Sequence, residues 1–134
     1  MAKKKVMIVD DSMIMRNVIK ETLDCDPKIT LTAAAANGEM AMKMLDMVKP
    51  DLILLDLEMP KMDGFEFMRN AKFKTQAKII VLSSIAKPGS AESKKALQLG
   101  AKAVIDKPSG SVSKDLKERR GTELRSAIYR VLAL

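Results

Sequence analysis

The chain has 134 residues, 47% of them hydrophobic and 31% charged, a balance typical of one folded domain with a buried core. It contains no histidine and a single cysteine, which excludes Ser-His-Asp and Cys-His triads, histidine metal sites and thiolate zinc sites. The net charge is +7, and the basic excess lies in the second half: residues 1–60 carry 8 basic and 10 acidic side chains, whereas residues 61–134 carry 16 and 7.

Five short apolar segments recur along the chain and predict five β-strands. We expect these strands at residues 4–10, 29–36, 51–57, 78–84 and 101–108. The first, third and fourth are nearly continuous hydrophobic runs, which is typical of strands that are covered on both faces in a parallel sheet.

Amphipathic segments of helical length follow each of these strands, and we expect helices at residues 12–23, 38–49, 64–72, 90–100 and 114–134. Asp11 or Ser12 is placed to cap the first helix, and Gly100 to end the fourth. Gly121 interrupts the last helical pattern at a cost of about 1 kcal/mol relative to alanine, which predicts a kink or an irregular first turn within residues 110–121.

Two helices carry apolar stripes from which their buried faces can be predicted. Ile14, Val18 and Thr22 share one face of the first helix, and a second stripe lies in the next helix at positions 41, 45 and 48. The chain has 11 methionines, which we interpret mainly as flexible core packing.

This alternation of strands and helices predicts an α/β fold, a doubly wound five-stranded parallel sheet with helices on both faces. No linker, repeat or low-complexity tract divides it, so we expect one domain over residues 1–134. No apolar run is long enough for a membrane span. Cys25 has no partner for an internal disulfide, which favours a reducing, cytoplasmic location.

Polar residues follow four of the predicted strands, at the edge where ligands bind in doubly wound sheets. They are Asp10 and Asp11, Asp56, Ser83 and Ser84, and Lys107 followed by Pro108. Three converging carboxylates require a cation, and oxygen ligands suit Mg²⁺, held by Asp10, Asp11 and Asp56 with the backbone carbonyl of Glu58. The ion and Lys107 would neutralise a phosphoryl group on Asp56, and the Ser83 hydroxyl could hydrogen-bond it.

Each of these residues also has an ordinary interpretation as a helix cap, a loop residue or a strand exit. The combination, however, resembles the receiver domain of bacterial two-component response regulators over nearly the whole chain. The stretches that carry the resemblance are VMIVDDSMIMR, DLILLDLEMPKMDG, IIVLSS and GAKAVIDKP.

The resemblance implies a flavodoxin-like fold with strand order 2-1-3-4-5 and assigns roles to the site residues. Asp56 would be the phosphoacceptor, Asp10 and Asp11 would position Mg²⁺, Ser83 would be the switch hydroxyl, and Lys107 would contact the phosphoryl group. It also implies a cis Lys107–Pro108 bond, and a loop shaped by Met59–Pro60 and Gly64.

Within that family, DDSMIMR, LSSIAKPGSAESKKALQLGA and DKPSGSVSKDL resemble the receiver of the chemotaxis methylesterase (CheB) more than the stand-alone, motor-binding type (CheY). The methylesterase half of such a protein is a serine hydrolase that needs a histidine, which this chain lacks. We therefore expect no independent enzyme here, beyond its own phosphoryl transfer and dephosphorylation. We expect the chain to be either a regulatory domain excised from a protein-glutamate methylesterase or a free-standing regulator.

Val104 departs from the family pattern, because receivers usually carry Tyr or Phe three residues before the strand-five lysine. Two hypotheses follow. In the first, a histidine kinase phosphorylates the chain, and the surface of helix four, strand five and helix five then switches its contacts with a protein effector or an attached output domain. In the second, Val104 marks a phosphorylation-independent interaction module.

The sequence argues against a third hypothesis, a small-molecule enzyme or phosphatase, because no glycine-rich loop follows strand one and Asp56 does not begin a DxD motif. Residues 87–134 carry 11 basic and 5 acidic side chains, which favours an acidic partner or an anionic ligand. With one Tyr, three Phe and no Trp, the chain lacks the aromatic platforms that bind single-stranded nucleic acid, so we expect no direct contact with nucleic acid.

Overall fold

The computed structural model describes residues 3–24, 26–59, 62–84, 89–107 and 114–134, with only the backbone for 114–120. A five-stranded parallel sheet forms its centre, in the order β2-β1-β3-β4-β5. The strands are β1 (Lys4–Val9), β2 (Ile29–Ala35), β3 (Leu52–Asp56), β4 (Lys78–Ser83) and β5 (Ala103–Asp106). Five helices connect and cover them: α1 (Met13–Leu23), α2 (Gly38–Met44), α3 (Gly64–Ala71), α4 (Ala91–Gln98) and α5 (Lys114–Leu132).

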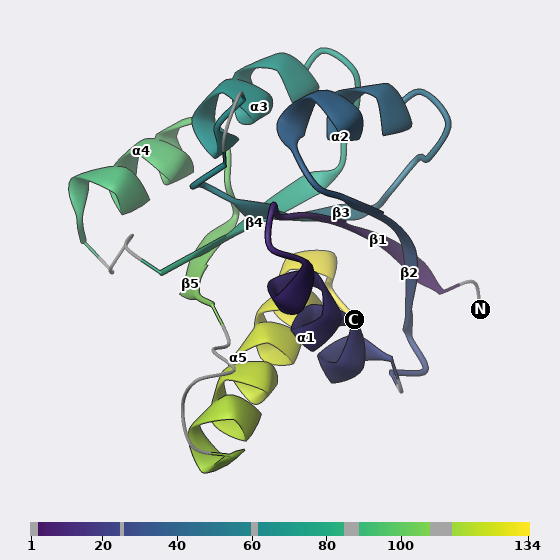
Figure 1. The fold of residues 1–134 in the computed structure, drawn as a ribbon, viewed down its shortest axis with the longest axis vertical. Helices are drawn as coiled ribbons and strands as arrows, with labels where there is room; N and C mark the ends of the chain where they lie inside the picture. The colour runs from purple at the N-terminus through teal and green to yellow at the C-terminus, as the bar shows by residue number, and fades with distance from the viewer. Residues whose placement is uncertain (1–2, 25, 60–61, 85–88, 108–113) are drawn as a thin grey trace.

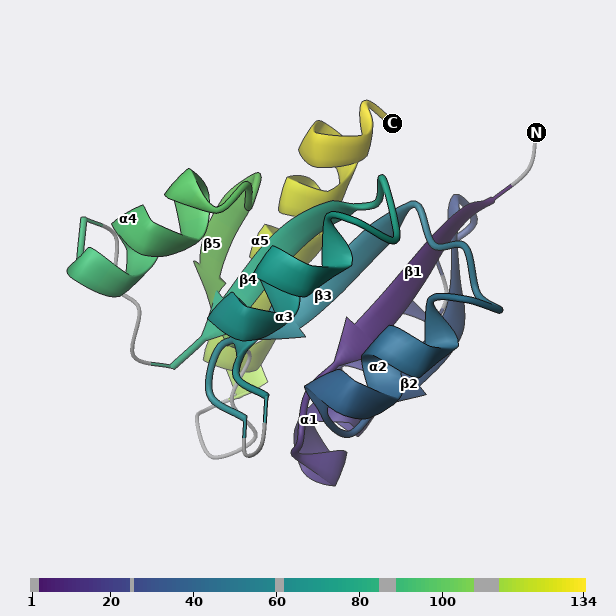
Figure 2. The same ribbon diagram turned by 90° about the horizontal axis from the view of Figure 1, so that it is seen from above.

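The helices lie in two layers, α2, α3 and α4 on one face of the sheet and α1 and α5 on the other (Figures 1 and 2). Side chains alternate between these layers along each strand. In β1, Met7 and Val9 join the core under α2, α3 and α4, while Val6 and Ile8 join the core under α1 and α5. Because both faces are covered, the strands read as continuous apolar runs, and the predicted doubly wound fold and strand order are confirmed.

Local signals set the helix ends. The Ser12 hydroxyl accepts a hydrogen bond from the backbone N–H of Met15 at 3.1 Å and so caps α1, as one of the two predicted caps. Asn37, Asp63 and Ser90 cap α2, α3 and α4 in the same way. Gly100, which follows α4, has a φ of 113°, a conformation that favours glycine.

The buried face of α1 differs from the predicted one. Ile14 is 70% exposed, and the buried residues are Val18, Ile19 and Leu23. At about 100° per residue, Ile14 lies about 140° around the helix from Ile19, the centre of the buried face, so it cannot share that face.

The interpretation of the methionines as core residues holds for only part of them. Met7, Met59 and Met68 are buried, but Met13 is 66% exposed and Met47 is 86% exposed. Met47 lies beyond the end of α2, which stops at Met44 rather than continuing to residue 49. The stripe across positions 41, 45 and 48 therefore contains one helical residue, a cap and a loop residue.

Gly121 lies within a continuous α5. A β-carbon at this position would lie 3.1 Å from Cγ2 of Thr22, so glycine allows α5 to approach α1 closely. The irregular turn expected within residues 110–121 is thus not found over 114–121, where α5 is unbroken, and residues 110–113 lie outside the described residues. Cys25, Pro60 and Pro108 with its expected cis bond also lie outside them. Within the described part of the chain, no helix is both long and apolar enough to cross a membrane.

Candidate functional site

The carboxyl edge of the sheet collects the polar residues that the sequence places after its strands. β1 is followed by Asp10 and Asp11, β3 ends at Asp56, β4 ends at Ser83, and Lys107 follows β5. The chain crosses from β1 to β2 on one side and enters β3 on the other, so Asp10 and Asp56 lie on adjacent strands at the switch point.

Three carboxylates converge at this edge. Oxygen atoms of Asp10, Asp11 and Asp56 lie within 4.8 Å of one another. Asp10 and Asp56 are each 1% exposed, whereas Asp11 is open to solvent. Lys107 reaches into the cluster, with its Nζ 3.0 Å from Oδ1 of Asp56 and 3.4 Å from Oδ2 of Asp10.

Backbone N–H groups hold one oxygen of each buried carboxylate. The N–H of Ser12 donates to Oδ1 of Asp10 at 2.9 Å, and the N–H of Glu58 donates to Oδ1 of Asp56 at 3.0 Å. Oδ2 of Asp56 is buried without a hydrogen-bond partner among the described residues, and Oδ2 of Asp10 is buried with the Lys107 ammonium 3.4 Å away. Buried charged oxygens with no donor are costly, and an all-oxygen set with free lone pairs fits a hard divalent cation such as Mg²⁺.

Burial dominates the electrostatics of this cluster. Desolvation raises the pKa of Asp56 to about 6, and the neighbouring Asp10 adds to this, while the N–H of Glu58 and the charge of Lys107 oppose it. The pKa of Asp10 is also raised, again mainly by burial. Desolvation of Lys107 acts to lower its pKa, but the two carboxylates outweigh it and the pKa is raised, so Lys107 stays protonated.

Three hydrogen bonds of the Arg16 and Glu58 side chains at this edge are not foreseen from the sequence. Arg16, the last residue of the DDSMIMR stretch, donates from Nη1 to the backbone carbonyl of Asp10 at 2.7 Å. Glu58 accepts hydrogen bonds from both hydroxyls at the end of β4, from Ser83 at 2.7 Å and from Ser84 at 3.2 Å. These contacts of the Glu58 side chain do not follow from the spacing of DLE, because its partners lie at the end of the neighbouring strand β4.

Val104 packs against the core under α2, α3 and α4, beside its pairing partner Val81 in β4. It is partly buried and one strand away from Ser83, so an aliphatic side chain occupies the position where the family pattern has an aromatic one.

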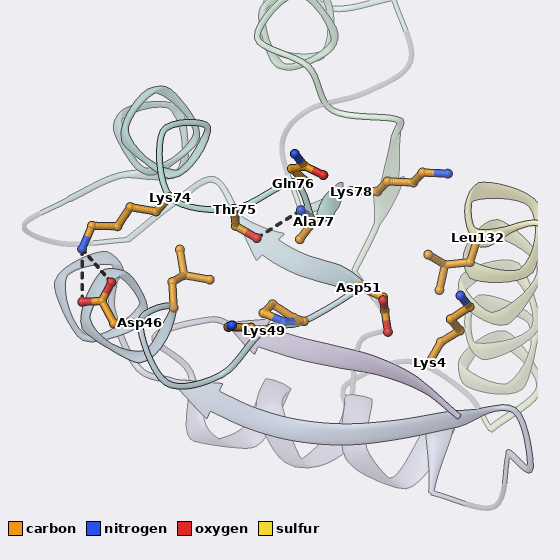
Figure 3. A pocket seen from close by; sticks show the side chains of 12 residues that line it. Lys4, Asp46, Lys49, Asp51, Lys74, Thr75, Gln76, Ala77, Lys78 and Leu132 are labelled. Carbon is orange, nitrogen blue, oxygen red and sulfur yellow. Dashed lines mark hydrogen bonds and ion pairs between the residues drawn. The ribbon is translucent and has the colours of Figure 1, made fainter. Parts of the chain in front are cut away.

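A separate cleft lies at the opposite, amino-terminal edge of the sheet (Figure 3). Its volume is about 650 Å³, and its walls come from the starts of β1 and β4, the segments before β3 and β4, and the end of α5. Charged residues line it, and the Lys74 ammonium pairs with Asp46 at 3.3 Å (Figure 3).

Fold and site together define a class, and the chain belongs to the response regulator receiver domain family, whose model matches residues 6–119. Such domains act in two-component signalling. Among solved structures, the chain is similar to the response regulator domain of Thermotoga maritima CheB, with a TM-score of 0.89 and 32% identity over 99% of this chain and 98% of that one.

Chemotaxis proteins recur among the similar sequences and structures. A protein-glutamate methylesterase/protein-glutamine glutaminase of Treponema denticola is 46% identical over 113 residues, covering 84% of this chain and 30% of that protein. The crystal structure of the P1 domain of CheA3 in complex with CheY6 from R. sphaeroides holds a chain that is 44% identical, with a TM-score of 0.83 and complete coverage of both chains. The chain spans about a third of the length of the methylesterase relatives.

Proposed function

We propose that the chain is a phosphorylation-controlled signalling switch that accepts a phosphoryl group on Asp56. One observation carries this proposal: Oδ2 of Asp56 is buried without a hydrogen-bond partner among the described residues, beside two further carboxylates and the Lys107 ammonium. A phosphoryl group bonded to that oxygen would lie beside the Lys107 ammonium, which could then pair with the phosphoryl oxygens.

The chemistry is a single transfer. Oδ2 of Asp56 attacks the phosphorus of a phosphohistidine or of acetyl phosphate and forms the new O–P bond. The P–N or P–O bond to the donor breaks, and the bonding electron pair leaves with the donor. Lys107, already 3.0 Å from Oδ1, offsets the added negative charge. Hydrolysis of the aspartyl phosphate by water restores the carboxylate.

Mg²⁺ would be held by the carboxylates of Asp10, Asp11 and Asp56 and the backbone carbonyl of Glu58, and it would supply positive charge to the phosphoryl oxygens. The N–H of Ser12 and the N–H of Glu58 orient two of these carboxylates. Ser83, fully buried at the end of the adjacent strand, would donate its hydroxyl proton to a phosphoryl oxygen.

The donor is a histidine kinase of the chemotaxis type. The complex of CheY6 with the P1 domain of CheA3 supports this choice, since a chain in that crystal structure is 44% identical to this one. The switched surface would comprise α4, β5 and α5, and it would act on a protein effector or on an attached methylesterase domain, as the methylesterase relatives suggest. Residues 1–134 would then form one receiver domain that works in the cytoplasm.

The test uses mass spectrometry after incubation with acetyl phosphate and Mg²⁺. We expect wild type to gain one phosphoryl group, and Asp56→Asn or chelation of Mg²⁺ to abolish the gain. Asp51→Asn is the matched control, because Asp51 precedes the same strand at its other end. Absence of phosphorylation in wild type would instead favour the phosphorylation-independent module that Val104 permits.

A further inference from the structure

The two hydroxyls at the end of β4 converge on one carboxylate. Ser83 Oγ donates to Oε1 of Glu58 at 2.7 Å, and Ser84 Oγ donates to Oε2 at 3.2 Å. The backbone N–H of the same glutamate donates to Oδ1 of Asp56 at 3.0 Å. Glu58 is therefore tied to the proposed phosphoacceptor through its backbone and to the proposed switch hydroxyl through its side chain.

We propose that Glu58 is a positioning residue that latches Ser83 and Ser84 in the resting state and competes with the phosphoryl group for the Ser83 hydroxyl. A serine hydroxyl carries one proton, so it cannot donate to Glu58 and to a phosphoryl oxygen at the same time. This proposal rests on the proposed function, since it concerns what happens when Asp56 is phosphorylated.

The latch is stronger than an ordinary serine contact for two reasons. Hydrogen bonds to an ionised carboxylate are stronger than neutral ones, and the 2.7 Å bond from Ser83 has the short length typical of them. Both carboxylate oxygens are engaged by consecutive residues, which fixes the orientation of the carboxylate. Release of Ser83 therefore weakens the hold on Ser84 as well.

The strands explain why this contact forms. β3 and β4 are neighbours in the sheet (Figure 1), and Asp56 pairs with Leu82 in register. Ser83 follows Leu82 on β4 and so lies close to the residues that follow Asp56, where Glu58 accepts its hydrogen bond. Ser83 is fully buried and Ser84 is exposed, so the latch joins the interior of the site to its surface. With Val104 in place of an aromatic, this path to the surface does not require an aromatic rotamer change.

Phosphorylation would act on the latch in two ways. The phosphoryl oxygens offer Ser83 a competing, more highly charged acceptor, and their negative charge repels the Glu58 carboxylate. A ligand shifts such an equilibrium only by its differential interaction with the two states, so removal of the latch should strengthen binding of a phosphoryl mimic.

The experiment is calorimetric titration of beryllofluoride at saturating Mg²⁺, with Mg²⁺ affinity measured separately for each variant. We expect Glu58→Ala to bind about 10-fold more tightly than wild type, and Glu58→Gln, which keeps one neutral acceptor, to fall between them. Glu58→Gln is nearly isosteric, so it keeps the test usable if the alanine variant folds poorly.

The matched control is the same substitution in a Ser83→Ala background, where there is no Ser83 hydroxyl to release. There only the repulsion by the Glu58 carboxylate remains to be relieved, so the gain from Glu58→Ala should fall to about 2-fold. An equal gain in both backgrounds would assign the effect to the lost charge alone and overturn the latch, as would unchanged affinity of Glu58→Ala.

The two proposals fail differently. If wild type and all variants bind no beryllofluoride, the proposed function is wrong and the latch falls with it. If wild type binds beryllofluoride and Asp56→Asn does not, while substitutions at Glu58 have no effect, the proposed function stands and the latch alone is refuted.

Discussion

The charged clusters at the two edges of the sheet differ in their exposure to solvent. At the carboxyl edge, Asp10 and Asp56 are almost fully buried, share one lysine and have raised pKa values. At the amino edge, Lys74 and Asp46 form an ion pair with side chains 40% and 65% exposed, beside the cleft of Figure 3. Water screens the Lys74–Asp46 pair but not the Asp10–Asp56–Lys107 cluster, so the cluster holds its charges at a cost that a ligand can relieve.

The largest expected change in stability comes from removing Lys107 at the carboxyl edge, and removal of Lys74 at the amino edge is its control. Without Mg²⁺ at pH 8, we expect Lys107→Met to lower the free energy of unfolding by about 3–4 kcal/mol, because it leaves two buried carboxylates uncompensated. Lys74→Met, the control, should change it by less than about 0.5 kcal/mol. Urea denaturation measures both. Equal changes for the two variants would show that burial does not separate the edges.

A smaller effect is expected from the glycines. At Gly64, a β-carbon would lie 2.7 Å from the backbone oxygen of Asp56 and 2.8 Å from Cα of Leu57, so Gly64→Ala should cost about 2–3 kcal/mol. Gly100, near the amino edge, has nothing within 4 Å of such a carbon and only its positive φ to oppose a side chain. Gly100→Ala should cost about 1 kcal/mol. Thermal unfolding of both variants tests which substitution costs more stability. A larger loss of stability for Gly100→Ala than for Gly64→Ala would contradict the prediction.

The carboxyl edge could be predicted from the sequence because its residues follow the strands directly. In a parallel sheet, all strands end at the same edge. The positions of Asp56 and Lys107 could therefore be predicted without knowing how side chains pack. The contacts of Glu58 and Arg16 depend on side-chain direction and on a neighbouring element, which spacing alone does not give. The amino edge was missed altogether, because its polar residues precede strands in segments with no distinctive motif.

A moderate effect of opposite sign should follow from removing one buried charge. Without Mg²⁺, Asp56→Asn should raise the free energy of unfolding by about 1 kcal/mol, because two adjacent buried carboxylates become one. Asp51→Asn should leave it within about 0.5 kcal/mol, since Asp51 is only partly buried. Mg²⁺ should then stabilise wild type more than Asp56→Asn. A loss of stability in Asp56→Asn would mean that Lys107 more than offsets the repulsion.

The smallest effect belongs to the amino edge and concerns pH. The Tyr129 hydroxyl lies 2.8 Å from each carboxylate oxygen of Asp26 and shares its one proton between them, which joins α5 to the segment before β2. This hydrogen bond, with burial and the Asp26 charge, raises the pKa of Tyr129 above 10.0, while Arg125 acts in the opposite direction. Lys28 lies over the ring, with its Nζ 5.3 Å from the centroid.

Because the pKa of Tyr129 is raised in the folded state, its contribution to stability is complete below pH 10 and is lost as the pH rises through the folded value. Tyr129→Phe keeps the ring under Lys28 but removes the hydroxyl. We therefore expect wild type to be more stable than Tyr129→Phe in urea at pH 8, and the difference to shrink as the pH rises above 10. A difference that stays constant across this range would show that the hydroxyl contributes through packing alone, since only a proton-dependent contact can disappear when the phenol ionises.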